Sequence, residues 1–195
     1  MRQTKTQVRA AILAARGAAT PQQRAAEADA LTAHLLRWVT PGSTVCAYVP
    51  VGSEPGSADL LDELNDRGVR VLLPVARQDD DGVPRPLWWG TYRAGTLVRA
   101  AFGLREPPTP HLPPETVAEA SGVLVPALAV DRRGTRLGRG AGFYDRTLQL
   151  AADAAPLVAV VRDEELVDAL PAEPHDVRMT HAVTPGLGVV ELRRE

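Results

Sequence analysis

Hydrophobic and polar positions divide the chain into short apolar runs and longer mixed segments. Apolar runs bounded by glycine or proline predict buried strands over residues 44–49, 69–73, 86–92, 123–130, 157–161, 181–184 and 187–192. Segments without internal glycine or proline predict helices over residues 5–16, 21–38, 58–67 and 144–154. Because strands and helices alternate, we expect a mostly parallel sheet between helical layers. The predicted fold class is α/β, a Rossmann-like three-layer α/β/α architecture.

Capping residues and composition agree with one folded domain. Thr20 and Pro21 form an N-cap and a first helical position, and Gly68 fits the C-cap of helix 58–67. The 195 residues show no internal repeat, so a single domain over 1–195 is predicted. Cys46 lies in an apolar run, which predicts a buried structural thiol.

Charge and hydropathy exclude several function classes. The net charge of -2 gives no general reason to expect nucleic acid or a membrane surface as a partner. The sequence contains no signal-peptide pattern and no apolar run of transmembrane length, so we expect a cytoplasmic protein.

A glycine-rich segment, residues 136–145, joins a predicted strand to a predicted helix. Such a turn can bind phosphate, because free backbone N–H groups and the positive end of the helix dipole face the anion. Arg136 and Arg139 add forked donors that suit phosphate oxygens. A tight strand-to-helix turn would also explain the three glycines. The two arginines and the final Asp145 favour a polyanion such as a nucleotide.

Several common catalytic motifs are missing from the sequence. It has no G-x-x-x-x-G-K-[ST], and Phe143 stands where a dinucleotide fingerprint starting at Gly138 needs its third glycine. It also has no C-x-x-C, H-E-x-x-H or G-x-S-x-G. Structural zinc and nucleophilic catalysis therefore lose support.

Four more charged residues are candidates for ligand binding. Lys5 and Arg9 lie one turn apart on helix 5–16, and Lys5 is the single lysine among 22 basic residues. Glu54 follows strand 44–49, at the sheet edge where open α/β sheets bind ligands. Asp176, like Asp145, could ligate Mg²⁺ through oxygen. Taken alone, each of these residues is more typical of an ordinary solvated surface.

The order of these motifs resembles that of the 5-formyltetrahydrofolate cyclo-ligase family, also called 5,10-methenyltetrahydrofolate synthetases. The similar segments span nearly the whole chain: Lys5 with Arg9, residues 48–54, residues 102–107 (Phe-Gly-x-x-Glu-Pro), residues 124–146 with the glycine loop, and residues 171–176 (Pro-x-Glu-Pro-His-Asp).

The resemblance implies ATP- and Mg²⁺-dependent cyclisation of 5-formyltetrahydrofolate to 5,10-methenyltetrahydrofolate, with release of ADP and phosphate. It assigns ATP binding to Lys5, Arg9, Arg136, Leu137, Gly138, Arg139, Gly140, Ala141, Gly142, Phe143 and Tyr144. It assigns the folate substrate to Val49, Glu54, Arg139, Gly140, Ala141, Gly142 and Phe143, and Mg²⁺ to Asp145 and Asp176. These assignments require helix 5–16 to fold over the glycine loop. Small molecules are the expected partners, and we expect a monomer.

The chain departs from the family pattern at four positions. Ala141 stands where glycine is common, Phe143 where tyrosine is common, Ser57 where threonine is usual, and Pro55 where an apolar residue of another kind usually follows the glutamate. A nucleotide- or folate-binding regulator on the same scaffold is the alternative interpretation. Sugar-phosphate isomerase or acyl-CoA transferase chemistry would need a catalytic carboxylate in a motif of its own, which the sequence lacks.

Overall fold

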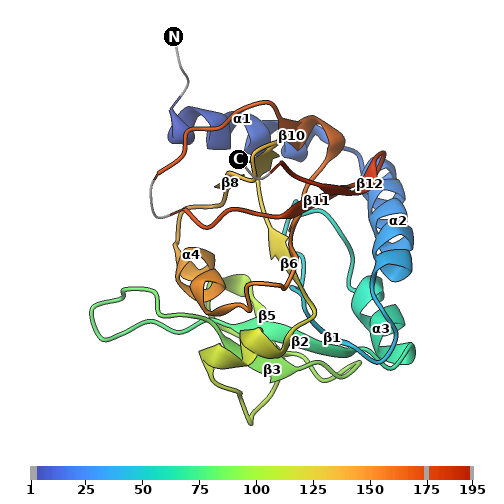
Figure 1. Cartoon of the computed structure of the whole chain (residues 1–195), viewed down its shortest axis with the longest axis vertical. Helices are drawn as coiled ribbons and strands as arrows, with labels where there is room; N and C mark the ends of the chain where they lie inside the picture. The colour runs from blue at the N-terminus through green and yellow to red at the C-terminus, as the bar shows by residue number, and fades with distance from the viewer. Residues whose placement is uncertain (1–3, 174–175, 194–195) are drawn as a thin grey trace.

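A seven-stranded sheet with helices on both faces forms the centre of the protein (Figure 1). The computed structural model describes residues 4–173 and 176–193. The strand order is β12-β11-β9-β6-β1-β2-β3. The central strands run parallel to one another: β1 (Thr44–Cys46), β2 (Arg70–Val75), β6 (Gly122–Pro126), β9 (Leu157–Val160) and β11 (His181–Thr184). The edge strands β3 (Trp88–Thr91) and β12 (Gly188–Glu191) are antiparallel to their neighbours. The predicted α/β class is confirmed.

Each face of the sheet has its own hydrophobic core. Helices α2 (Pro21–Trp38) and α3 (Asp59–Asp66) cover one face, and α4 (Phe143–Thr147) with the 3₁₀ helices η2 (Pro114–Glu119) and η3 (Leu148–Leu150) covers the other. Successive residues of β1 point to opposite faces, so Val45 belongs to the first core and Cys46 to the second. Burial raises the pKa of the Cys46 thiol, which is fully enclosed as predicted.

Two smaller sheets accompany the large one. Strands β7 (Ala129–Asp131), β8 (Arg136–Leu137) and β10 (Leu166–Val167) form a second sheet in the order β10-β7-β8, and β4 (Val98–Arg99) pairs with β5 (Arg105–Glu106). Single 3₁₀ turns lie at η1 (Ala101–Gly103) and η4 (Asp163–Glu165). Helix α1 (Lys5–Ala18) lies near β8 and β10 (Figure 1).

The single strand predicted over residues 123–130 is wrong, because the chain changes sheets within it. Pro126 still pairs with Val160 in the large sheet, whereas the Leu128 amide donates to the Leu137 carbonyl in the small one at 2.7 Å. Hydrophobicity could not reveal this change, since the residues are buried in both sheets. The segment between β6 and β7 thereby becomes available to line a cavity.

The helix predicted over residues 144–154 is also wrong in length. Helix α4 ends at Thr147 and tightens into η3. The Thr147 hydroxyl donates to the Phe143 carbonyl at 2.7 Å and accepts from the Leu87 amide at 2.8 Å. A hydroxyl bonded back to position i−4 favours bending of a helix. Because α4 is so short, its dipole offers little to an anion, so the predicted phosphate site would depend on the arginines and the loop amides.

Helix 21–38 and strand 181–184 are confirmed at both ends, and the remaining predicted elements exist with shifted ends. Helix α1 continues to Ala18, and β1 stops at Cys46 rather than at residue 49. Among the residues that the structure describes, no helix has the length and hydropathy needed to cross a membrane.

The capping box of α2 gives a testable stability effect. The Thr20 hydroxyl accepts from the Gln23 amide at 3.1 Å, and the Gln23 side chain accepts from the Thr20 amide at 2.8 Å. We expect Thr20→Ala to lower the free energy of unfolding by about 1 kcal/mol, measured by urea denaturation. Thr20→Ser keeps the hydroxyl and should retain the stability, so equal losses in both variants would contradict this role.

Candidate functional site

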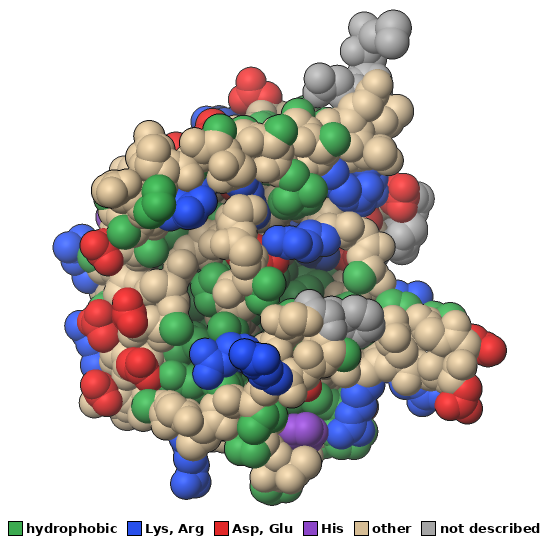
Figure 2. All heavy atoms as spheres, turned by 180° about the vertical axis from the view of Figure 1, so that it is seen from behind, with side chains coloured by type: hydrophobic (Ala, Val, Ile, Leu, Met, Phe, Trp, Pro, Cys, Tyr) green, Lys and Arg blue, Asp and Glu red, His purple; other side chains and the backbone are tan. Residues whose placement is uncertain are grey.

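A cavity of about 440 Å³ lies between α1, the loop after β1 and the glycine loop. This volume is in the range of small-molecule sites. On the face opposite to that of Figure 1, Figure 2 shows a central hollow with hydrophobic side chains inside it and Lys or Arg side chains on more than one side. All the residues that the sequence assigned to ATP, substrate or Mg²⁺ line this cavity: Lys5, Arg9, Val49, Glu54, residues 136–145 and Asp176.

Three of the predicted cations are paired with predicted anions across the cavity wall. Lys5 Nζ lies 3.2 Å from an Asp176 carboxylate oxygen, and an Arg136 nitrogen lies 2.6 Å from Asp145. Arg139 Nε lies 3.1 Å from Glu54. A bound phosphate would have to compete with these carboxylates for the cations. If a phosphate takes over these cations, the carboxylates that now pair with them lose their partners and can bind another ligand.

Arg136 is the most enclosed of these cations. Its side chain is 6% exposed, one terminal nitrogen donates to the Pro126 carbonyl at 3.3 Å, and the guanidinium carbon lies 5.7 Å from the Tyr144 ring centre. Within the described part of the chain, its Nε atom has no hydrogen-bond partner. A buried donor without an acceptor is costly, so a ligand oxygen at this position would be favourable.

Arg9 connects α1 to the glycine loop. Its Nε donates to the Gly138 carbonyl at 2.9 Å, and no carboxylate of the described residues forms an ion pair with it. Helix α1 thus folds over the loop, as the assignments from sequence required. The unpaired positive charge of Arg9 is suited to a phosphate group.

The loop after β1 contributes Glu54 and the apolar residues Val49 and Val51 to the cavity wall. The Glu54 carboxylate accepts from the Val51 amide at 2.9 Å, and the Tyr48 hydroxyl donates to the Pro55 carbonyl at 2.7 Å, which fixes the loop around Glu54. Burial raises the pKa of the Tyr48 and Tyr144 phenols, and the nearby Glu54 carboxylate raises both further. Both phenols therefore stay neutral and can serve a heterocycle as polar contacts.

The cavity offers two carboxylates as the predicted metal ligands, Asp145 and Asp176. Among the described residues, no three His, Cys, Asp or Glu side chains gather closely enough to hold a metal ion. In nucleotide sites, however, Mg²⁺ is typically bound by one or two carboxylates together with phosphate oxygens. Asp145 and Asp176 both reach the cavity and fit that smaller donor set.

Sequence reasoning missed several residues of the cavity. Arg16 lies seven positions after Arg9, and thus on the same face of α1, so helical spacing could have indicated it. Gln78 comes from a segment outside the motifs, and Arg105 occupies one of the two unspecified positions of the motif 102–107. No pattern in the sequence connects either residue with the glycine loop. The two late-motif residues 174 and 175 lie outside the described residues.

The arrangement combines cations for phosphate with an apolar wall for a flat ring. The described residues that line the cavity include no Ser, Cys or His, and the two phenols are neutral. A covalent step on a serine, cysteine or histidine therefore has no candidate among them. Phosphoryl transfer between bound ligands needs positioning and charge neutralisation rather than a protein nucleophile, and the cavity offers both.

Comparison of the sequence with known proteins gives one family. The family model of the 5-formyltetrahydrofolate cyclo-ligase family matches residues 1–185. A protein of Mycolicibacterium smegmatis named 5-formyltetrahydrofolate cyclo-ligase is 62% identical over 190 residues, which cover 97% of this chain and 98% of that protein. A protein of the same name from Escherichia coli K12 is 29% identical over 87% of this chain and 94% of its own length.

Two solved structures share the fold. The 5,10-methenyltetrahydrofolate synthetase of Aquifex aeolicus has a TM-score of 0.78 at 23% identity, over 99% of this chain and 95% of its own. The 5,10-methenyltetrahydrofolate synthetase of Mycoplasma pneumoniae has a TM-score of 0.69 at 20% identity, over 91% and 96%. With the family model matched over almost the whole length, the chain belongs to the 5-formyltetrahydrofolate cyclo-ligase family.

Proposed function

We propose that this enzyme cyclises 5-formyltetrahydrofolate to 5,10-methenyltetrahydrofolate with ATP and Mg²⁺, releasing ADP and phosphate. The observation that carries the proposal is one cavity in which the cations of α1 and the glycine loop face the Glu54 loop and an apolar wall. Family membership supplies the substrate class. The absence of serine, cysteine and histidine among the described lining residues supports direct transfer between the two ligands.

The proposed reaction has two steps. The formyl oxygen attacks the γ-phosphorus of ATP, and the bond from phosphorus to the bridging oxygen breaks as ADP leaves. The N10 lone pair then attacks the formyl carbon and forms the new C–N bond. The carbon–oxygen bond breaks, inorganic phosphate leaves with that oxygen, and N10 loses its proton to give the methenyl cation. Phosphorylation is needed because an unmodified formamide oxygen is a poor leaving group.

Different residues of the cavity bind the phosphates of ATP and the pterin of the folate. Lys5, Arg9 and the backbone of the glycine loop hold the phosphates, while Val49 and Glu54 hold the pterin. Arg136 changes its partner from Asp145 to the transferring phosphoryl group, where its forked donors stabilise the charge that spreads over the equatorial oxygens.

Asp145 and Asp176 would hold Mg²⁺ together with the phosphate oxygens of ATP. The ion would neutralise part of the negative charge that develops on the phosphates. Lys5 and Arg136, which pair with these carboxylates in the free site, then contact phosphate instead.

The proposal is tested by incubating the purified protein with 5-formyltetrahydrofolate, ATP and MgCl₂ while the near-ultraviolet absorbance of the methenyl product is recorded. We expect an ATP-dependent rise in absorbance. If absorbance does not rise although calorimetry shows ATP binding, the chain is instead a nucleotide-binding regulator on this scaffold.

Lys5 should act on the nucleotide rather than on the folate. Lys5→Ala removes a charge next to Asp176, so we expect the Michaelis constant for ATP to rise about tenfold and that for the folate to change less than about twofold. Initial rates at varied concentrations of each substrate measure both constants. A larger change for the folate would remove Lys5 from the phosphate site.

A further inference from the structure

Helix α1, which carries Lys5 and Arg9, is held to the protein by an unusual contact. Arg16 is its single buried residue, and this side chain is 1% exposed. The apolar residues Val8 and Ile12 are only partly buried against the small sheet, and Leu13 is 40% exposed. Partial apolar burial of this kind is non-directional, so it restrains rotation of the helix poorly.

The guanidinium of Arg16 forms a fork, meaning two parallel hydrogen bonds to one carboxylate group. Its Nε and one terminal nitrogen donate to the two carboxylate oxygens of Glu165 at 2.6 and 2.7 Å, and that same terminal nitrogen donates to the Ala127 carbonyl at 2.7 Å. The Glu165 side chain is 3% exposed. Parallel bonds between a guanidinium and a carboxylate fix orientation as well as distance.

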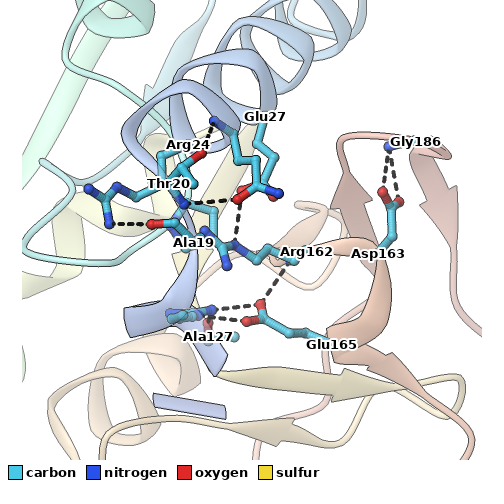
Figure 3. A network of polar contacts seen from close by, with 12 residues as sticks. Ala19, Thr20, Arg24, Glu27, Ala127, Arg162, Asp163, Glu165 and Gly186 are labelled. Atoms are coloured by element: carbon cyan, nitrogen blue, oxygen red, sulfur yellow. Dashed lines mark hydrogen bonds and ion pairs between the residues drawn. The ribbon is translucent and has the colours of Figure 1, made fainter. Parts of the chain in front are cut away.

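A wider network holds Glu165 itself in place (Figure 3). One of its carboxylate oxygens also accepts from the Arg162 amide at 2.8 Å, and the Arg162 side chain lies 2.9 Å from Glu27 of α2. Ala127 belongs to the segment where the chain crosses from β6 to β7 and lines the cavity. The fork therefore joins α1 to α2, to η4 and to the wall of the site.

Arg16 shares a helix face with the two cations of the proposed phosphate site. Lys5, Arg9 and Arg16 are separated by four and seven residues, which correspond to about one and two helical turns, and all three line the cavity. Turning α1 about its axis would therefore move Lys5 and Arg9 away from the glycine loop.

We propose that Arg16 is a positioning residue: its buried pair with Glu165 fixes the rotation and axial placement of α1 and so holds Lys5 and Arg9 against the phosphates. The inference rests on the ATP site of the proposed function. A buried ion pair adds little net stability compared with neutral side chains of similar volume. The pair should therefore influence nucleotide affinity more than folding.

The experiment compares two double variants with the same change in composition. Arg16→Met/Glu165→Gln removes both buried charges and leaves an acceptor for the Arg162 amide. Arg70→Met/Glu119→Gln makes the same change in an exposed pair outside the cavity lining, with nitrogen and oxygen 2.7 Å apart. Affinity for ATP with MgCl₂ is measured by calorimetry, Michaelis constants by initial rates, and the melting temperature by circular dichroism.

We expect the buried double variant to bind ATP about tenfold to a hundredfold more weakly than the control. Its melting temperature should stay within about 5 °C of the control, and its Michaelis constant for the folate should remain within about twofold. Arg16→Lys keeps the charge but not the fork, and it should recover part of the affinity. Equal ATP affinity in the buried variant and the control would overturn the proposal, as would equal losses for ATP and folate.

If the buried double variant does not fold, Arg16→Lys still tests the proposal. In this case Arg16→Lys should weaken ATP binding about threefold to tenfold, and wild-type affinity would overturn the proposal. A wild-type protein that binds ATP but forms no methenyl product refutes only the proposed function. A wild-type protein without ATP affinity refutes both.

Discussion

Arg136→Met is expected to lower kcat/KM for cyclisation by about a thousandfold. The guanidinium is 6% exposed, lies 2.6 Å from Asp145, and has an Nε donor without a partner among the described residues. The Nε donor of Arg136 can therefore bind an acceptor oxygen of the ligand. Since charge on the phosphoryl group develops most fully in the transition state, kcat should fall more than the Michaelis constant for ATP rises.

Two comparisons separate this role from a general loss of stability. Arg132→Met removes an exposed arginine that lies 3.5 Å from Asp168 outside the cavity lining, and its kcat/KM should stay within about twofold of wild type. Arg136→Lys keeps a charge but cannot donate two parallel bonds, so its kcat/KM should fall by about a hundredfold. If Arg136→Met keeps more than about a tenth of the wild-type kcat/KM, the phosphoryl contact is wrong.

Local patterns predicted the elements of this fold better than the connections between them. The N-cap at Thr20, the helices of the first half and the strands of the large sheet depend on neighbouring residues, and they formed near their predicted positions. The crossing between β6 and β7 depends on partners far away in the chain, Val160 for Pro126 and Leu137 for Leu128. No window of sequence around residues 123–130 contains that information.

In the candidate site, too, local motifs were predictable and long-range partners were not. Its predicted residues belong to compact motifs, and the structure brings all of them to one cavity, although their roles remain predictions. Arg16 was missed because its meaning depends on Glu165, which is 149 residues later in the sequence. Its spacing from Arg9 places Arg16 on the cavity face of the helix, but spacing alone does not tell a buried, paired arginine from a solvated one.

Gly138→Ala should lower kcat/KM about tenfold to a hundredfold, through Arg136 rather than through the backbone. Gly138 is not among the glycines with positive φ, so alanine fits its backbone conformation. A Cβ atom there would lie 2.6 Å from a terminal nitrogen of Arg136 and 3.3 Å from its guanidinium carbon. The enclosed guanidinium would have to move away from Asp145 and from the place proposed for the phosphoryl group. Ala141→Gly, which removes a methyl group from an exposed position of the same loop, should change kcat/KM by less than about threefold.

A double-mutant cycle tests whether the methyl group acts on Arg136. In an Arg136→Ala background the added methyl group has no guanidinium to displace, so Gly138→Ala should then change kcat/KM by less than about threefold. Purely additive losses would mean that the methyl group harms the loop in another way, for example by weakening the bond from Arg9 to the Gly138 carbonyl. Non-additive losses would show that Gly138 is needed because it leaves room for the Arg136 side chain. The two residues occupy adjoining space, so a methyl group at residue 138 displaces the guanidinium.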